Sequence, residues 1–112
     1  MMTTKLPLDS NDNPIPALRL KDSGAHVINT SAISARNGVA FDPETRVISV
    51  YATQDVYLNF GDSSVTATGS HHFFPAGVYY DIAIGGDIIG HYSHVAALRV
   101  GADGQLYISE KE

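Results

Sequence analysis

From about residue 25 onward, apolar and polar residues alternate with a period of two, and this alternation constrains the fold more than any other feature of the sequence. In residues 46–53, Ile48, Val50 and Ala52 fall on one face, and adjacent side chains of a strand point to opposite faces. The same pattern predicts strands in 55–61, 77–86, 95–100 and 105–109, and weaker ones in 25–30, 38–42, 70–74 and 87–92. The further residues expected to face the core are Val56, Leu58, Phe60, Val78, Tyr80, Ile82, Ile84, Ala96, Leu98, Val100, Leu106 and Ile108.

Turn-forming residues separate these segments at short intervals. They are Asn37-Gly38, Asp42-Pro43, Gly61-Asp62, Pro75-Ala76-Gly77, Gly85-Gly86 and Asp103-Gly104. Asp103-Gly104 is the strongest signal for a two-residue hairpin. No window shows a sustained helical stripe, so we expect an all-β fold: a two-sheet sandwich of about eight strands, with jelly-roll and Ig-like connections both open.

The first 24 residues differ from the rest of the chain. They are polar, and they contain Pro7, Pro14 and Pro16, which cannot donate ladder hydrogen bonds. We therefore expect residues 1–24 to form an extended N-terminal arm and residues 25–112 to form a single β-sandwich domain. A chain of 112 residues has little room for a second core.

Composition excludes several classes of function. The chain carries a net charge of −5 without a cluster of Lys or Arg, which argues against a nucleic-acid partner. No apolar run reaches the roughly 18 residues that span a bilayer, and the N-terminus lacks a signal-like segment, so we expect synthesis in a cytoplasm and no membrane partner. Because there is no cysteine, disulfides and thiol chemistry are excluded.

Four histidines are the candidate metal ligands: His71, His72, His91 and His94. His71 and His72 are adjacent, so on a regular strand they point to opposite faces and cannot hold one ion together. His91 and His94 converge only if a turn brings them together, and zinc needs about three protein ligands. We therefore predict neither a metal nor a cofactor, and histidines that lie on a surface or an interface.

The stretch "FPAGVYYDI" resembles the second conserved motif of cupins, in which a Pro-x-Gly turn precedes a metal-ligating histidine. Tyr79 or Tyr80 occupies that position here, and the His-x-His motif of cupins has no counterpart. The resemblance implies an alternative function, a cupin-like or lectin-like module that binds a metal or small ligand near the four histidines. No nucleophile elbow, phosphate loop or dinucleotide fingerprint is present, so we predict no enzymatic activity and no catalytic residues.

Four tyrosines fall opposite the aliphatic residues of their own segments: Tyr51, Tyr57, Tyr79 and Tyr107. Tyrosine is enriched in the cores of protein interfaces, where charged residues are depleted. We predict that these tyrosines form a contact with another subunit. The alternative is cross-strand aromatic pairing on a hydrated sheet.

The chain as a whole resembles small virion proteins of tailed bacteriophages. The resemblance rests on an N-terminal segment that ends in "NPIPALRLKDSGAHVINTS", on the central "RVISVYATQDVYLNFGDSSVTATGSHHFFPAGVYYDIAIGGD", and on the closing "VAALRVGADGQLYISE". It implies a non-enzymatic β-sandwich that forms homo-oligomers and docks on other virion proteins. Such proteins act as capsid decoration or cement, or as accessories of the tail or head-tail junction. The implied location is the virion, after synthesis in a bacterial host.

Overall fold

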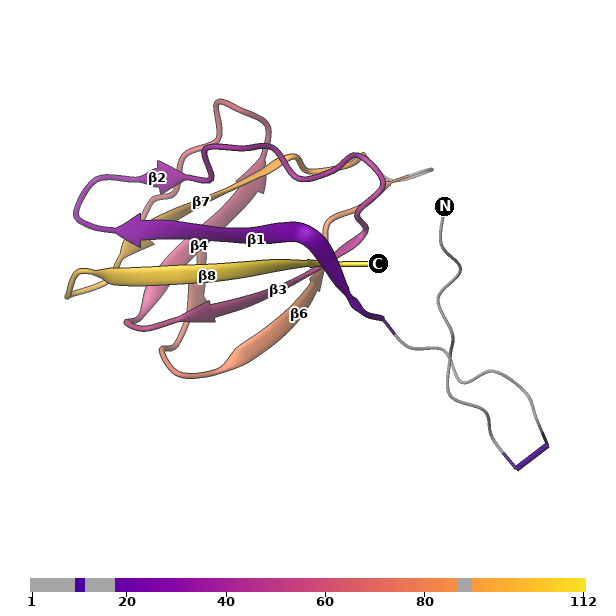
Figure 1. Cartoon of the computed structure of the whole chain (residues 1–112). Coiled ribbons are helices and arrows are strands. Elements are labelled where there is room, and N and C mark those ends of the chain that lie inside the picture. Colours follow the sequence, from indigo (N-terminus) through magenta and orange to yellow (C-terminus); the bar gives the residue numbers. More distant parts are fainter. Residues whose placement is uncertain (1–9, 12–17, 87–89) are drawn as a thin grey trace.

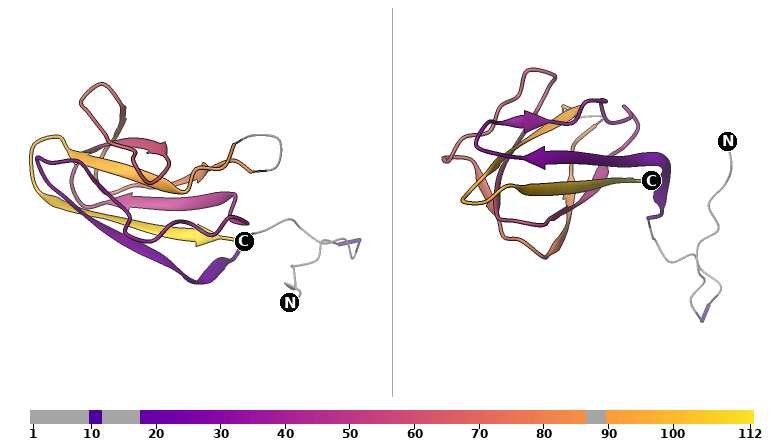
Figure 2. Two further views of the ribbon diagram at one scale, coloured as in Figure 1. Left: turned by 90° about the horizontal axis from the view of Figure 1, so that it is seen from above. Right: turned by 60° about the vertical axis from the view of Figure 1, so that its left-hand side comes forward.

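The computed structural model describes residues 10–11, 18–86 and 90–112, which form an all-β fold of two antiparallel sheets (Figure 1). The first sheet has the order β1-β8-β3-β6 and the second the order β2-β7-β4-β5. The two sheets lie in facing layers (Figure 2). The strands are β1 (Leu20–Thr30), β2 (Ala35–Arg36), β3 (Val47–Ala52), β4 (Val56–Gly61), β5 (His72–Phe74), β6 (Tyr79–Ala83), β7 (His94–Arg99) and β8 (Gly104–Lys111). No helix in these ranges is long and apolar enough to cross a membrane.

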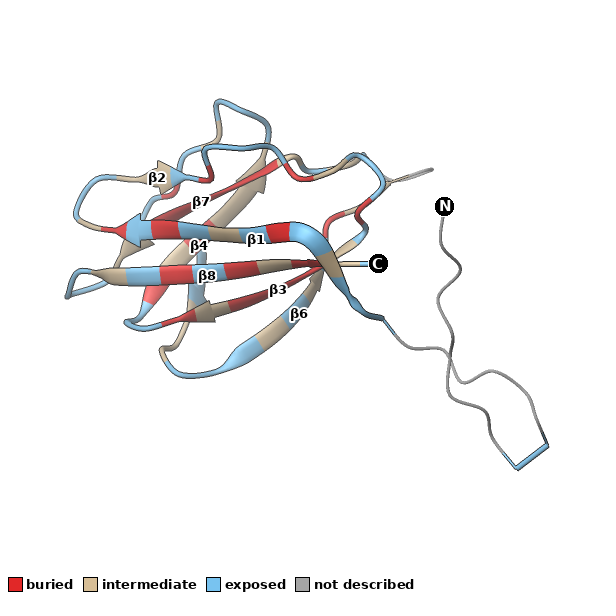
Figure 3. Ribbon diagram, viewed as in Figure 1, coloured by how far each residue is buried: buried red, intermediate tan, exposed pale blue. Residues whose placement is uncertain are grey.

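The core lies between the two sheets, and most of it is what the period-two pattern predicts. Buried and exposed residues alternate along β8, where Leu106 and Ile108 are inside (Figure 3). The predicted inward residues of β3 are also buried, while those of β6 are only half-buried. The cluster of buried apolar residues consists of Ile28, Phe41, Ile48, Val50, Ala52, Val56, Leu58, Ile84, Val95, Ala97, Leu106 and Ile108.

The prediction for the inward face of β7 was wrong. Val95 and Ala97 point into the core, whereas Val100 is exposed. Ala96 lies on the outer face yet is also fully buried, because the segment between β4 and β5 runs over this part of the sheet. Asn59, the outward neighbour of Ala96, donates from Nδ2 to the Thr66 carbonyl at 3.0 Å. A strand that is covered on both faces shows no polar alternation from which its inward face can be read.

The hairpin expected at Asp103-Gly104 does not form. The two strands that flank this turn, β7 and β8, belong to different sheets. β8 pairs with β1 on one side and β3 on the other, so both of its edges are occupied. The turn therefore carries the chain from one layer to the other.

The first strand begins inside the predicted N-terminal arm. β1 starts at Leu20, which pairs with Lys111, and a bulge follows before the regular register resumes at Ala25. Ser23 in the bulge has a φ of +59°. β1 thus overlaps the last residues of the arm expected over 1–24, and residues 1–9 and 12–17 of that arm lie outside the described residues.

Three other segments differ from the sequence prediction. Residues 38–42 form no strand, although Phe41 is buried in the core. Within the expected strand 87–92, residues 87–89 lie outside the described part and 90–92 are irregular. The short β2 was not predicted, because two residues are too few to show a period.

The core arrangement predicts a large difference between two leucines. Leu58 is fully buried, whereas Leu20 is 66% exposed. We expect Leu58→Ala to lower the free energy of unfolding by about 2–5 kcal/mol, because it leaves a cavity. Leu20→Ala, the matched control, should change it by less than about 0.5 kcal/mol. Urea denaturation measures both, and similar losses for the two variants would contradict the assigned core.

Candidate functional site

The first sheet aligns three tyrosines and a valine in one row across its four strands. Tyr79 of β6 is opposite Tyr51 of β3, Tyr51 is opposite Tyr107 of β8, and Tyr107 is opposite Val27 of β1. All four point away from the core, because the residues next to them in each strand point inward. We call these four residues the tyrosine row.

The tyrosine row is open to solvent at several points. Tyr79 is 70% exposed, Val27 55% and Tyr107 41%, while Tyr51 is half-buried between its neighbours. The rings of Tyr51 and Tyr79 pack with their centroids 4.7 Å apart. Tyr107 donates from its hydroxyl to Gln105 Oε1 at 2.6 Å. The row is therefore an ordered apolar strip in which the Tyr107 hydroxyl is held by Gln105.

The residues beside the tyrosine row are small or uncharged, with one ion pair. The next row across the sheet is Asp81, Ser49, Ser109 and Ala25, and the one after it is Ala83, Val47, Lys111 and Leu20. Asp81 and Lys111 are the charged members of these rows, and they neutralise each other through a 2.8 Å ion pair. These three rows form the outer face of the first sheet.

Tyr57 does not join the other tyrosines. It lies on the outer face of the second sheet, where it is opposite Phe73 of β5 and Leu98 of β7. Its ring meets Phe73 edge-on, with centroids 6.1 Å apart. The structure thus brings Tyr51, Tyr79 and Tyr107 together and separates Tyr57 from them by the thickness of the sandwich.

The four candidate histidines are dispersed over different elements. His71 lies before β5 and accepts from the Thr68 amide, whereas His72 is exposed at the start of β5. His94 is buried at the start of β7. His91 donates from Nε2 to the carbonyl of Thr45 at 2.8 Å. In residues 10–11, 18–86 and 90–112, no three His, Asp or Glu side chains are grouped to hold a metal ion.

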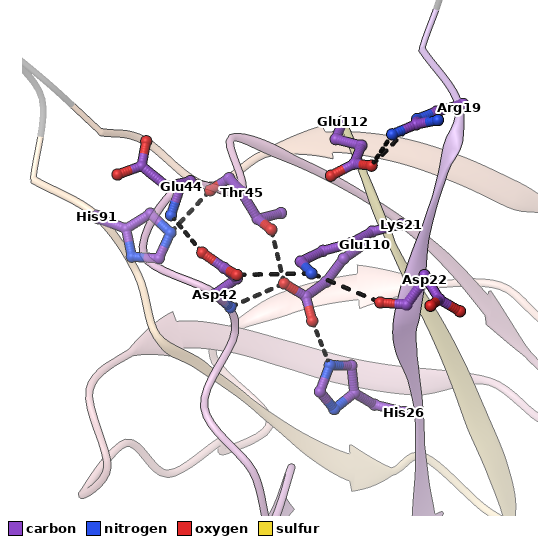
Figure 4. A network of polar contacts seen from close by, with 10 residues as sticks. All are labelled: Arg19, Lys21, Asp22, His26, Asp42, Glu44, Thr45, His91, Glu110 and Glu112. Atoms are coloured by element: carbon purple, nitrogen blue, oxygen red, sulfur yellow. Dashed lines mark hydrogen bonds and ion pairs between the residues drawn. The ribbon is translucent and has the colours of Figure 1, made fainter. Parts of the chain in front are cut away.

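A buried carboxylate forms a polar cluster that sequence reasoning missed (Figure 4). Glu110 is only 3% exposed and points inward from β8. Its Oε1 accepts from the Asp42 amide at 2.8 Å and from Thr45 Oγ1 at 2.7 Å, and its Oε2 is 2.8 Å from His26 Nε2. Figure 4 shows these partners converging on the carboxylate from β1, which carries His26, and from the segment before β3, which carries Asp42 and Thr45. We call this cluster the Glu110 network.

The Glu110 network favours the ionised glutamate. Burial raises the pKa of Glu110, but the hydrogen bonds from Thr45, His26 and the Asp42 amide outweigh this effect and hold the pKa below its ordinary value. The pKa of Asp42 is also lowered, mainly by the hydrogen bond from the Glu44 amide. The network joins β1, β8 and the segment before β3, so we assign it a structural role.

One sequence signal could have revealed this network. Glu110 has the same parity as Leu106 and Ile108, so extending the expected strand 105–109 by one residue would have placed a carboxylate inside. A buried charge needs hydrogen-bonding partners. The sequence does not show which residues supply them, because His26 and Thr45 lie 84 and 65 positions away.

Comparisons with protein-family models, with curated proteins and with solved structures found no match to this chain.

The Glu110 network predicts a defined pH dependence of stability. The pKa of Glu110 in the folded protein lies below its ordinary value of 4.5, so its stabilising effect is complete above pH 4.5 and is lost as the pH falls further. At pH 7 we expect Glu110→Gln to lower the free energy of unfolding by about 1–3 kcal/mol. This difference should shrink in urea titrations below pH 4.5. The exposed Glu112→Gln is the control, and a difference for Glu110→Gln that persists unchanged at pH 3 would contradict the assignment.

Proposed function

We propose that the protein is a non-enzymatic structural component of a phage particle. In this proposal it assembles with copies of itself, and docks on other virion proteins, through the outer face of the first sheet. The observation that carries the proposal is the tyrosine row, in which Tyr79, Tyr51, Tyr107 and Val27 lie in register on four neighbouring strands.

The exposure of the tyrosine row supports a contact with another protein. Cross-strand aromatic pairing explains the position of Tyr51, because this residue packs against Tyr79 and is half-buried. It does not account for Tyr79 and Val27, which leave most of their surface in water. Burying these side chains on a partner removes apolar area from water at about 25 cal/mol per Å². The Asp81–Lys111 ion pair leaves the face without net charge, so like copies can approach it without strong repulsion.

The strand order supports a jelly roll rather than an Ig-like sandwich. The orders β1-β8-β3-β6 and β2-β7-β4-β5 place four strands in each sheet, and every connection from β2 to β8 except β4–β5 leads to the other sheet. Ig-like domains instead keep the order ABED in one sheet and CFG in the other. Jelly rolls occur in viral capsid proteins, in lectins and in cupins, so the fold is compatible with a virion role but does not specify it. The resemblance of the sequence to small virion proteins supports that role further.

The described residues do not favour the cupin-like alternative. The turn Pro75-Ala76-Gly77 is present, with Gly77 at a φ of +83°. Of the two tyrosines that follow it, Tyr79 points outward, and Tyr80 packs edge-on against Phe74 with centroids 5.0 Å apart. Neither tyrosine faces a cluster of histidines, since the four candidate histidines lie apart.

The proposal predicts that the tyrosine row controls native mass. We expect the double variant Tyr79→Ser/Tyr107→Ser to weaken self-association at least tenfold, because interface tyrosines at hot spots each cost more than about 1 kcal/mol when truncated. Size-exclusion chromatography with light scattering over a concentration series measures this. Tyr57→Ser is the matched control, because it removes a tyrosine from the opposite face.

Two results would contradict the proposed self-association. One is a wild-type protein that stays monomeric up to high micromolar concentration. The other is a native mass that Tyr79→Ser/Tyr107→Ser leaves unchanged. Circular dichroism of each variant confirms that a lower mass reflects lost contact rather than lost folding.

A further inference from the structure

The first sheet ends in an open edge at β6. In Figure 1 this strand borders the sheet on the side opposite β1. The Ile84 amide donates to the Arg46 carbonyl at 2.8 Å, and Ile84 lies one position beyond the pair Ala83–Val47. Because backbone groups alternate along an antiparallel strand, those of Tyr80 and Ile82 also face β3. The amides and carbonyls of Tyr79, Asp81 and Ala83 therefore face away from the sheet, where another strand can pair with them.

The other edge of the same sheet is less suited to strand addition. β1 carries a bulge between Leu20 and Ala25, with Ser23 at positive φ. Bulges of this kind interrupt pairing and protect edges from further strands. β6 has no register shift along its pairing with β3. The regular edge is therefore the one at β6.

Asp81 limits which strand can add at β6. It is the central residue of the strand, so fully overlapped antiparallel pairing of β6 with the same strand of a second copy would place two Asp81 carboxylates opposite each other, each already paired with its own Lys111. Like charges in directly opposite positions destabilise a sheet. A strand that fits needs a neutral or cationic residue opposite Asp81. It also needs apolar or β-branched residues beside Tyr80 and Ile82, which are only half-buried.

Residues 3–8 of this chain, "TTKLPL", have that pattern. If Lys5 lies opposite Asp81 in an antiparallel pair, Leu6 falls beside Tyr80 and Thr4 beside Ile82. Lys5 is also the first Lys or Arg of the chain, and the next is Arg19. Pro7 then lies opposite Tyr79 with its nitrogen toward β6, so the ladder loses the bond to the Tyr79 carbonyl at this end of the pair.

The small area of the outer face of the first sheet is a reason to expect a second contact. Four strands about 4.8 Å apart and five residues at about 3.3 Å each cover a plane of roughly 300 Å². Stable complexes bury about 800 Å² on each partner, so this face alone is small.

Residues 9–17, which connect residues 3–8 to the fold, can span up to about 30 Å. The segment is therefore long enough to reach a neighbouring copy.

We propose that residues 3–8 of one copy add as a fifth strand to the β6 edge of a second copy, antiparallel to β6 and with Lys5 opposite Asp81. This inference rests on the proposed self-association and specifies its second contact. It assigns the N-terminal segment a binding role and β6 the role of acceptor.

Disulfide trapping tests this pairing directly, because the chain has no cysteine of its own. Hydrogen-bonded residues of an antiparallel pair have Cα atoms about 5.5 Å apart, within the range that a disulfide bridges. We mix the full-length Lys5→Cys variant with the full-length Asp81→Cys variant under mild oxidation. The expected product is the mixed dimer, in excess over both symmetric dimers. Glu44→Cys, an exposed residue outside β6, replaces Asp81→Cys as the control and should give little product.

A lack of mixed dimer, or equal trapping of Lys5→Cys by Glu44→Cys, would overturn the inference. So would an unchanged native mass after deletion of residues 2–9, which leaves every described strand intact. Each of these results can occur while Tyr79→Ser/Tyr107→Ser still lowers the mass, in which case only the strand addition fails. If both sets of variants leave the mass unchanged, the proposed self-association fails as well.

Pairing of residues 3–8 with β6 of the same chain would also overturn the strand addition between copies. It would appear as a disulfide within monomers of the doubly substituted Lys5→Cys/Asp81→Cys variant.

Discussion

The fold depends on the pairing of β8 with β1 on one side and β3 on the other. This strand holds the middle of the first sheet, and it contributes Leu106 and Ile108 to the core between the layers. It also carries Glu110, whose carboxylate is bound by partners from β1 and from the segment before β3. One strand thus joins both sheet neighbours through its backbone, and its buried charge also binds β1 and the segment before β3. If such a charge is replaced while its hydrogen-bond donors remain, the free energy of unfolding falls by more than the net contribution of any one of these hydrogen bonds.

The same pairing determines what the protein presents to its surroundings. Because the inward residues of β1, β8, β3 and β6 are aligned in register, the outward residues are aligned too. The tyrosine row is the outward counterpart of an inward row that contains Tyr80, Val50, Ile108 and His26. Stability and the candidate contact surface therefore have one structural origin. A change in the register of β8 by one residue would exchange the two faces.

The proposed structural role depends on repeated contacts between copies. A modest contact that is repeated by symmetry yields a stable assembly, because each copy adds the same interface again. A flat sheet face gives the contact area, and an open edge gives directional backbone hydrogen bonds that a flat face lacks. The two proposed contacts lie on the same sheet, so they can act on neighbouring copies together. The same fold occurs in proteins of many functions, and the proposed function depends on the particular residues of this sheet.

The sequence by itself determined the fold class, most of the core and the outward direction of all four tyrosines, because side-chain alternation in a strand is a local property. Extending the alternation of the last expected strand by one residue would also have placed Glu110 on the inward face, although its partners could not be named. Only the tertiary structure decided that β7 and β8 lie in different sheets, that Val95 and Ala97 rather than Ala96 and Leu98 face the core, and that Tyr57 is separated from the other tyrosines. These features depend on which strands become neighbours and which loops cover them. Strand neighbours and loop positions are determined by contacts between residues far apart in the chain, so a local sequence pattern does not predict them.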